Sequence, residues 1–218
     1  MMLDTFGVVT TGASLAAVVA ATLGGRAAPL WNRTVLVALA GAWIGLVVAL
    51  TASGHVRDFP VFVALFAASL IAAPFVWRGA ASQTIVALNV LRLLGVSFLL
   101  LAYAGQLGGP FPYFAGIGDM ITGAFALPIA LSMRGEGVND PRVLAWNAFG
   151  LLDLVVAVTL GVMSGNGSSL QVFHIGAGSA AIATLPWSLI PLVLVPVFAT
   201  GHVLIFARAA TARRAIAA

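Results

Sequence analysis

The sequence contains no cysteine and no lysine, and these absences exclude several kinds of chemistry. Without cysteine, the 218-residue chain can form neither a disulfide nor a thiolate metal site. All ten basic residues are arginines, so the chain cannot form a lysine imine with a carbonyl compound such as retinal.

Charged residues are also scarce. They make up 7% of the chain, whereas about a quarter of the residues in a soluble domain are charged. Hydrophobic residues make up 61%, and the mean hydropathy is +1.11. This composition excludes an ordinary soluble domain and predicts a polytopic membrane protein with the lipid bilayer as its solvent. The net charge of +4 comes from arginines in short connections and the C-terminal tail, which argues against a nucleic-acid partner.

The chain lacks the common motifs of intramembrane and nucleotide-driven enzymes. G-x-S-x-G, H-E-x-x-H and Walker sequences are absent. His202 is the only histidine inside a long apolar run, which excludes a bis-histidine haem and a multi-histidine zinc centre. We therefore expect no metal and no cofactor, and the sequence favours a protein that is not an enzyme.

Seven long apolar runs are present, each near the about 20 residues that an α-helix needs to cross the bilayer core. Because the runs show no polar alternation, helices are favoured over a β-barrel. The sequence therefore predicts an all-α membrane protein, a seven-transmembrane-helix bundle in a single domain (1–218). The predicted spans are 6–23, 34–53, 60–77, 84–105, 112–132, 143–163 and 182–207.

The placement of arginines predicts the orientation of this bundle. The first, third and fifth connections and the tail hold eight arginines, whereas the other side holds only Arg57. We therefore expect the N-terminus outside and the C-terminus in the cytoplasm. The eight arginines are Arg26, Arg33, Arg78, Arg134, Arg142, Arg208, Arg213 and Arg214.

Three charged residues, Arg92, Asp119 and Asp153, lie inside predicted spans. A charge at the bilayer centre costs at least about 2.5–3.5 kcal/mol, so a compensating arrangement is expected. At a rise of 1.5 Å per residue they lie ~12, ~20 and ~15 Å from the cytoplasmic end, differences that an arginine side chain can bridge. Since a guanidinium binds carboxylates bidentately, we predict one cation between two carboxylates.

This predicted cluster has two interpretations. With both carboxylates ionised it is net negative, and a low dielectric pushes the second carboxyl toward its neutral form. Such a group could bind and release a proton or bind a cation, which favours a transporter or channel for a proton or small solute. Alternatively, the three residues form a static ion pair that fixes helix packing. The alternative function is a receptor, or a subunit of a larger membrane complex, and the sequence leaves a homo-oligomer open.

A second polar layer consists of Asn89, Asn147 and His202, ~6–8 Å from the inner boundary. His202 could relay protons between the cytoplasm and the carboxylates, because imidazole titrates near neutrality. Alternatively, it only forms a hydrogen bond to an asparagine, and this interpretation is slightly favoured. Together with the three charged residues, this layer completes the predicted solute- or ion-binding site.

Two prolines inside span seven, Pro191 and Pro196, lack the N–H groups that would donate to the carbonyls of Trp187 and Leu192, four residues earlier. Free carbonyls in a broken helix can coordinate ions or allow bending on gating. Alternatively, Ser188 or water satisfies them.

Three further residues, His55, Asp58 and His174, fall on the outer face, where they could form a metal or pH-sensing site. Their irregular spacing on two loops favours ordinary solvated residues.

Several strings in the second half of the chain resemble a group of uncharacterised bacterial integral membrane proteins. They are RLLG at 92–95, GIGD at 116–119, WNAFGLLDL at 146–154 and LPWSLIP at 185–191, with His202. The resemblance covers spans four to seven. It implies a bacterial inner membrane and carries no named activity.

Overall fold

The structure is a computed structural model that describes residues 2–24, 30–133 and 137–217, and none of these residues forms a β-strand. The predicted all-α class is confirmed. The longer helices are α1 (Met2–Gly24), α2 (Leu30–Ala52), α3 (Phe59–Ala72), α6 (Phe111–Ser132), α7 (Pro141–Met163) and α8 (Val195–Ala217). One further column stacks α4 (Ser82–Leu88), the 3-10 helix η3 (Asn89–Gly95) and α5 (Val96–Tyr103). Short elements are the 3-10 turns η1 (His55–Arg57), η2 (Ala73–Phe75) and η4 (Ala180–Ala183), and the π-helical turn η5 (Ile190–Leu194).

Six helical segments are long and apolar enough to cross a membrane. The third predicted span, 60–77, is the exception: the apolar helix there is Phe59–Phe75, about 25 Å at 1.5 Å per residue. Pro74 accounts for its early end, because a proline lacks the N–H that would continue an α-helix. The chain therefore leaves α3 at Ala72 and passes into η2.

The last predicted span, 182–207, is wrong at both ends. The continuous helix begins at Ile190, as η5 followed by α8, and extends to Ala217. The late start fits the two prolines there: Pro186 precedes the helix, and Pro191 lies in its first turn, where a missing N–H has no intrahelical partner to lose. Alanine and arginine, both strong helix formers, explain the extension of the C-terminal end. The other predicted spans agree with the helices to within about four residues.

Helix starts follow the usual chemistry of a first turn. The side chain of Asp140 caps α7 by accepting the backbone N–H of Arg142 at 2.8 Å. Pro141, the first residue of that helix, lacks an N–H that would have no partner there. Pro60 and Pro112 occupy the same kind of position in α3 and α6.

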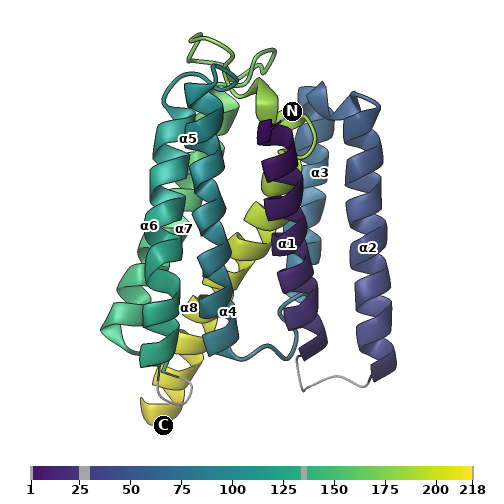
Figure 1. The fold of residues 1–218 in the computed structure, drawn as a ribbon. Coiled ribbons are helices and arrows are strands. Elements are labelled where there is room, and N and C mark those ends of the chain that lie inside the picture. The colour runs from purple at the N-terminus through teal and green to yellow at the C-terminus, as the bar shows by residue number, and fades with distance from the viewer. Residues whose placement is uncertain (1, 25–29, 134–136, 218) are drawn as a thin grey trace.

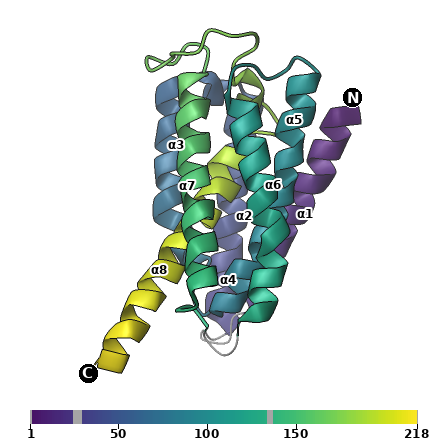
Figure 2. The same ribbon diagram turned by 90° about the vertical axis from the view of Figure 1, so that its left-hand side faces the viewer.

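Helix α8 crosses the bundle obliquely, and its C-terminal part projects beyond the other helices (Figures 1 and 2). The α4–η3–α5 column, α6 and α7 lie on one side of it, and α1, α2 and α3 lie on the other (Figure 1). The most extensive contacts join α6 to η3 and to α7. The core of the molecule therefore lies where the column, α6, α7 and α8 meet.

The two ends of the bundle differ in their connections. Met2 and residues 164–179 lie at one end, called here the N-terminal end, and the C-terminus lies at the other (Figure 1). The connection after α3, with Arg78, and the start of α7, with Arg142, share the C-terminal end with Arg208, Arg213 and Arg214 of α8 (Figure 1). Arg57 lies at the N-terminal end. Arg26 and Arg134 lie outside the described residues.

Candidate functional site

Arg92 lies between Asp119 and Asp153, so the predicted pairing of one cation with two carboxylates is confirmed. Its Nε donates to Asp119 Oδ1 at 2.6 Å, and its Nη2 donates to Asp153 Oδ2. All three residues are buried, and Arg92 is only 2% exposed. Hydrogen bonds between charged groups are roughly twice as strong as neutral ones, so they offset much of the burial cost. These residues form the ion-pair cluster.

His202 and Asn147 extend the ion-pair cluster. Arg92 Nη1 donates to the carbonyl of Gly150 at 3.0 Å and lies 3.1 Å from His202 Nε2. Because a guanidinium has only donors, Nε2 must accept, and the ring is neutral with its proton on Nδ1. That N–H donates to Asn147 Oδ1 at 2.8 Å, and Asn147 Nδ2 donates to the carbonyl of His202 at 3.0 Å. Four of the five guanidinium N–H groups thus have acceptors within the protein.

The 3-10 geometry of η3 aims Arg92 at its partners. Side chains three residues apart are eclipsed in a 3-10 helix, so they lie in one line along it. Asn89, Arg92 and Gly95 share such a line, and they are the buried residues of η3. Since η3 packs mainly against α6, this line faces the helix that carries Asp119.

Glycines allow η3 and α6 to approach closely at the level of the ion-pair cluster. A Cβ on Gly95 would lie 2.9 Å from the carbonyl oxygen of Gly116, and one on Gly123 would lie 2.8 Å from a backbone nitrogen of η3. Real Cβ atoms essentially never approach other atoms this closely. The two backbones therefore meet at a distance that only glycine permits, and this brings Asp119 to Arg92.

Two other glycines leave room for the side chains of the site itself. A Cβ on Gly118 would overlap the carboxylate of Asp153. A Cβ on Gly150 would lie 2.6 Å from Cε1 of the His202 ring. Any larger residue at either position would displace a member of the site.

The two carbonyls that the prolines of span seven would free are both occupied. Ser69 Oγ donates to the carbonyl of Leu192, and the backbone N–H of Ile190 donates to that of Trp187 at 3.1 Å. The donor to Leu192 is thus Ser69 of α3, rather than Ser188 or water. Each carbonyl therefore has a donor within the protein, and these hydrogen bonds take the place of those that the prolines cannot make.

The remaining candidates are not joined to the ion-pair cluster by hydrogen bonds. Asn89 Nδ2 donates to the carbonyl of Ile85 one turn back, and its Oδ1 has no partner among the described residues. His55, Asp58 and His174 are exposed. In the described part of the chain, no group of three or more His, Cys, Asp or Glu side chains could hold a metal ion.

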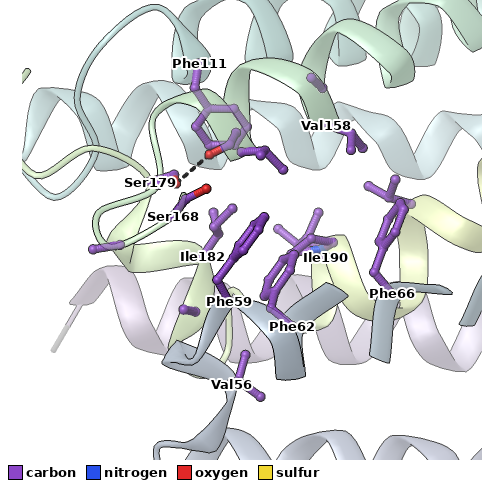
Figure 3. Close-up of a pocket in the computed structure, with 18 of the residues that line it drawn as sticks. Val56, Phe59, Phe62, Phe66, Phe111, Val158, Ser168, Ser179, Ile182 and Ile190 are labelled. Atoms are coloured by element: carbon purple, nitrogen blue, oxygen red, sulfur yellow. Dashed lines mark hydrogen bonds between the residues drawn. The ribbon is translucent and has the colours of Figure 1, made fainter. Parts of the chain in front are cut away.

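A cavity of about 140 Å³ extends from the connection after α7, at the N-terminal end of the bundle, to Asp119 of the ion-pair cluster. Figure 3 shows part of its lining. Its mouth includes Arg57 and Ser168. Its walls come from α3, α7, η4 and η5 and are mostly apolar. Five phenylalanines line it: Phe59, Phe62, Phe66, Phe98 and Phe111.

Asp119 provides the polar inner end of this cavity. It is the acidic residue among those lining the cavity, and its side chain is 10% exposed. Its Oδ1 is bound to Arg92, whereas its Oδ2 accepts no hydrogen bond from the residues that the structure describes. The carboxylate of Asp119 thus forms part of the cavity lining, and one of its two oxygens has no donor among the described residues.

Sequence reasoning missed the glycines and the phenylalanines, although both leave a signal. Gly95, Gly116 and Gly150 each stand three residues from a charged member of the ion-pair cluster, which places them on the same helix face. Phe59, Phe62 and Phe66 recur at helical spacing along α3. In a chain with 24 glycines and 13 phenylalanines, neither pattern stands out before the packing is known.

Residues 59–210 match the sequence model of a family described as a domain of unknown function, DUF8737. The chain belongs to this family. The matched part begins at α3 and includes every residue of the ion-pair cluster, with Asn147 and His202, whereas α1 and α2 precede it. No curated protein and no solved structure matches the chain.

Proposed function

We propose that the chain is a multi-pass protein of a bacterial inner membrane, with seven spans, the N-terminus outside and the C-terminus in the cytoplasm. The six apolar helices of sufficient length support the membrane location. The arginines near the C-terminal end of the bundle support the orientation, because positive residues favour the cytoplasmic side. Helix α3 with η2 serves as the shortest span, since a bilayer can thin locally around a short helix.

In that membrane, the protein binds a small solute or a proton at the ion-pair cluster and carries it across. The observation that carries this proposal is the cavity that extends from the N-terminal end to Asp119 of the ion-pair cluster. With His202 neutral, one arginine and two ionised aspartates sum to a charge of −1. Since an uncompensated buried ion costs several kcal/mol, the fully ionised cluster favours the arrival of a proton or a cation.

The hydrogen bonds beyond Arg92 supply a continuation toward the other end of the bundle. His202 Nε2 accepts from Arg92, and the opposite side of the ring meets Asn147. Asn89 lies one turn before Arg92, and its Oδ1 is a free acceptor among the described residues. These groups form the inner half of the proposed route.

Proton flux into sealed liposomes tests the proposal. The protein is reconstituted around a trapped pH-sensitive dye, and a potassium diffusion potential drives protons inward. We expect the wild-type protein to acidify the lumen faster than empty liposomes, and Asp119→Asn and Asp153→Asn each to lose this excess. Asp58→Asn is the matched control, because Asp58 is exposed and outside the ion-pair cluster.

Unchanged flux in folded Asp119→Asn and Asp153→Asn variants would contradict a role for the ion-pair cluster in transport. A wild-type protein that moves neither protons nor a small organic ammonium ion would contradict transport itself.

The second candidate is a receptor that does not transport, or a subunit of a larger membrane complex. The closed geometry around Arg92, with four of five N–H groups occupied and 2% exposure, favours it. Binding without flux, together with co-purification of a stable partner, is its expected signature.

A further inference from the structure

The size of the cavity limits what it can hold. An engineered protein cavity of about 150 Å³ with apolar walls accommodates benzene. The cavity beside α3 is about 140 Å³ and is open toward the N-terminal end. It therefore suits a molecule whose apolar body is about the size of a benzene ring.

The walls exclude most hydrated ions. Five phenylalanine rings and several aliphatic side chains line the space. Figure 3 labels four of these rings, those of Phe59, Phe62, Phe66 and Phe111. Inorganic cations such as Mg²⁺ and Ca²⁺ need six or more oxygen ligands, and Asp119 is the single acidic residue among the described residues that line this cavity. Aromatic rings instead attract organic cations through their negative faces.

The inner end determines the charge of the occupant. Asp119 Oδ2 is unpaired among the described residues, and the ion-pair cluster is net negative when both aspartates are ionised. An anionic group placed there would be repelled, and a purely apolar group would leave the oxygen without a donor. A protonated amine supplies both a donor and the missing positive charge. The exposed guanidinium of Arg57, at the mouth, opposes a cation only weakly because solvent ions screen it over about 8 Å.

We infer that this cavity binds a small lipophilic ammonium ion, with its apolar body among the phenylalanines of α3 and its ammonium group on Asp119. This inference rests on the proposed function, because it names the class of solute that the ion-pair cluster would receive. Binding of the ammonium ion is a separate event from its transport, so the two can fail independently.

Equilibrium dialysis of radiolabelled benzylammonium tests the inference. The full chain is embedded in lipid nanodiscs, and binding to empty nanodiscs is subtracted. Benzyl alcohol, which has the same shape without the charge, serves as the second probe. We expect the wild-type protein to bind benzylammonium at least about ten-fold more tightly than benzyl alcohol, as a charged hydrogen bond implies.

Two variants locate the bound probe. Asp119→Asn should weaken benzylammonium binding by about ten-fold or more and leave benzyl alcohol nearly unaffected. Val158→Trp, which places a large side chain in the cavity, should abolish binding of both probes. Val155→Trp is the matched control on the same helix, because Val155 is 55% exposed on the outside of the bundle, and it should bind as the wild type does.

Equal affinity of the wild type for both probes would overturn the inference without any variant being needed. So would benzylammonium binding that survives Val158→Trp. If protons move in an Asp119-dependent way but benzylammonium does not bind, the inference fails and the proposed function stands. If benzylammonium binds as expected but no flux is seen, the inference stands and transport fails.

Discussion

At Arg92, a single side chain connects four helical elements. From η3 it bonds to Asp119 on α6, to Asp153 and Gly150 on α7, and to His202 on α8. Lysine could not replace it, because an ammonium is a point charge and lacks the planar fork that serves several acceptors at once. The guanidinium therefore both neutralises charge in the ion-pair cluster and links η3 to α6, α7 and α8 by hydrogen bonds.

Removing this arginine alone should be strongly destabilising. Arg92→Met leaves two buried carboxylates without a cation, and breaking a buried ion pair costs about 3–5 kcal/mol. The triple variant Arg92→Met, Asp119→Leu, Asp153→Leu replaces the whole ion-pair cluster by apolar side chains and should recover most of that loss. Thermal unfolding followed by circular dichroism in detergent measures both.

The comparison separates structure from function at this site. The recovered triple variant should still fail to bind benzylammonium. A single Arg92→Met variant that melts with the wild type would show that the ion-pair cluster contributes nothing to stability.

The sequence predicted the ion-pair cluster because charge is so rare in this chain that three buried charges at compatible depth had few other partners. It did not predict which polar neighbours would join. Asn89 and Asn147 have similar predicted depths, yet Asn147 pairs with His202 whereas Asn89 bonds to Ile85 of the preceding helix α4. Depth depends only on residue number, but the direction of a side chain depends on helix rotation, which the sequence does not give.

At the scale of elements, the close contacts of helices depend on glycine. Gly150→Ala should displace the His202 ring and lower the free energy of unfolding by about 1–3 kcal/mol, as overpacking does. Gly41→Ala in α2 is the control, because a Cβ there meets nothing within 4 Å. It should be neutral or stabilising by up to about 1 kcal/mol, since alanine favours helix. Melting temperatures that fall equally in the two variants would contradict this account.

The attachment of α3 to the last helix gives a second prediction. Trp43 Nε1 donates to Ser69 Oγ at 2.9 Å, and Ser69 in turn donates to Leu192. Ser69→Ala removes both bonds and should cost about 1–3 kcal/mol through the unpaired buried groups. Adding Pro196→Ala restores a backbone N–H one turn after Leu192 and should return part of that stability.

Thermal unfolding of the single and double variants measures this compensation. Ser132→Ala is the control, because that serine is exposed and bonds only within its own helix. A double variant less stable than Ser69→Ala alone would contradict the view that the unpaired carbonyl of Leu192 causes the loss of stability.

Element boundaries were predictable where one strong signal acted alone. Pro141 and Asp140 mark the start of α7 within two residues of the expected 143. In span seven, hydropathy favoured a long helix from 182, whereas two prolines opposed it, and the prolines decided the outcome. The average hydropathy of a segment does not register that a proline lacks a backbone N–H. The π-helical turn η5 was therefore not predicted.

For the whole molecule, the absence of cysteine makes the proposed orientation directly testable. Ser169→Cys places a single thiol in the connection at the N-terminal end, and Thr211→Cys places one on the exposed C-terminal part of α8. In intact cells with a permeable outer membrane, a membrane-impermeant maleimide should label Ser169→Cys alone. Thr211→Cys should react only after the inner membrane is opened. The reverse pattern would invert the proposed topology.

The family match and the site coincide at this scale. The matched residues, 59–210, include Phe59, Phe62 and Phe66 of α3 and all hydrogen-bonded members of the site. Helices α1 and α2 precede the match, and α2 contributes Trp43 and Thr51, which bond to Ser69 and Ser188. Helix α2 is therefore hydrogen-bonded to the matched part but contributes no residue to the ion-pair cluster.

The 3-10 segment η3 has a mechanical consequence. Each residue rises about 2.0 Å in a 3-10 helix and about 1.5 Å in an α-helix, so the seven residues of η3 hold about 3.5 Å of extra length. They are also wound more tightly, by about 20° per residue. If η3 changed to α geometry, the α4–η3–α5 column would become shorter and α5 would rotate about the helix axis relative to α4. The side chain of Arg92, in the middle of η3, would then no longer be aligned with Asn89 and Gly95.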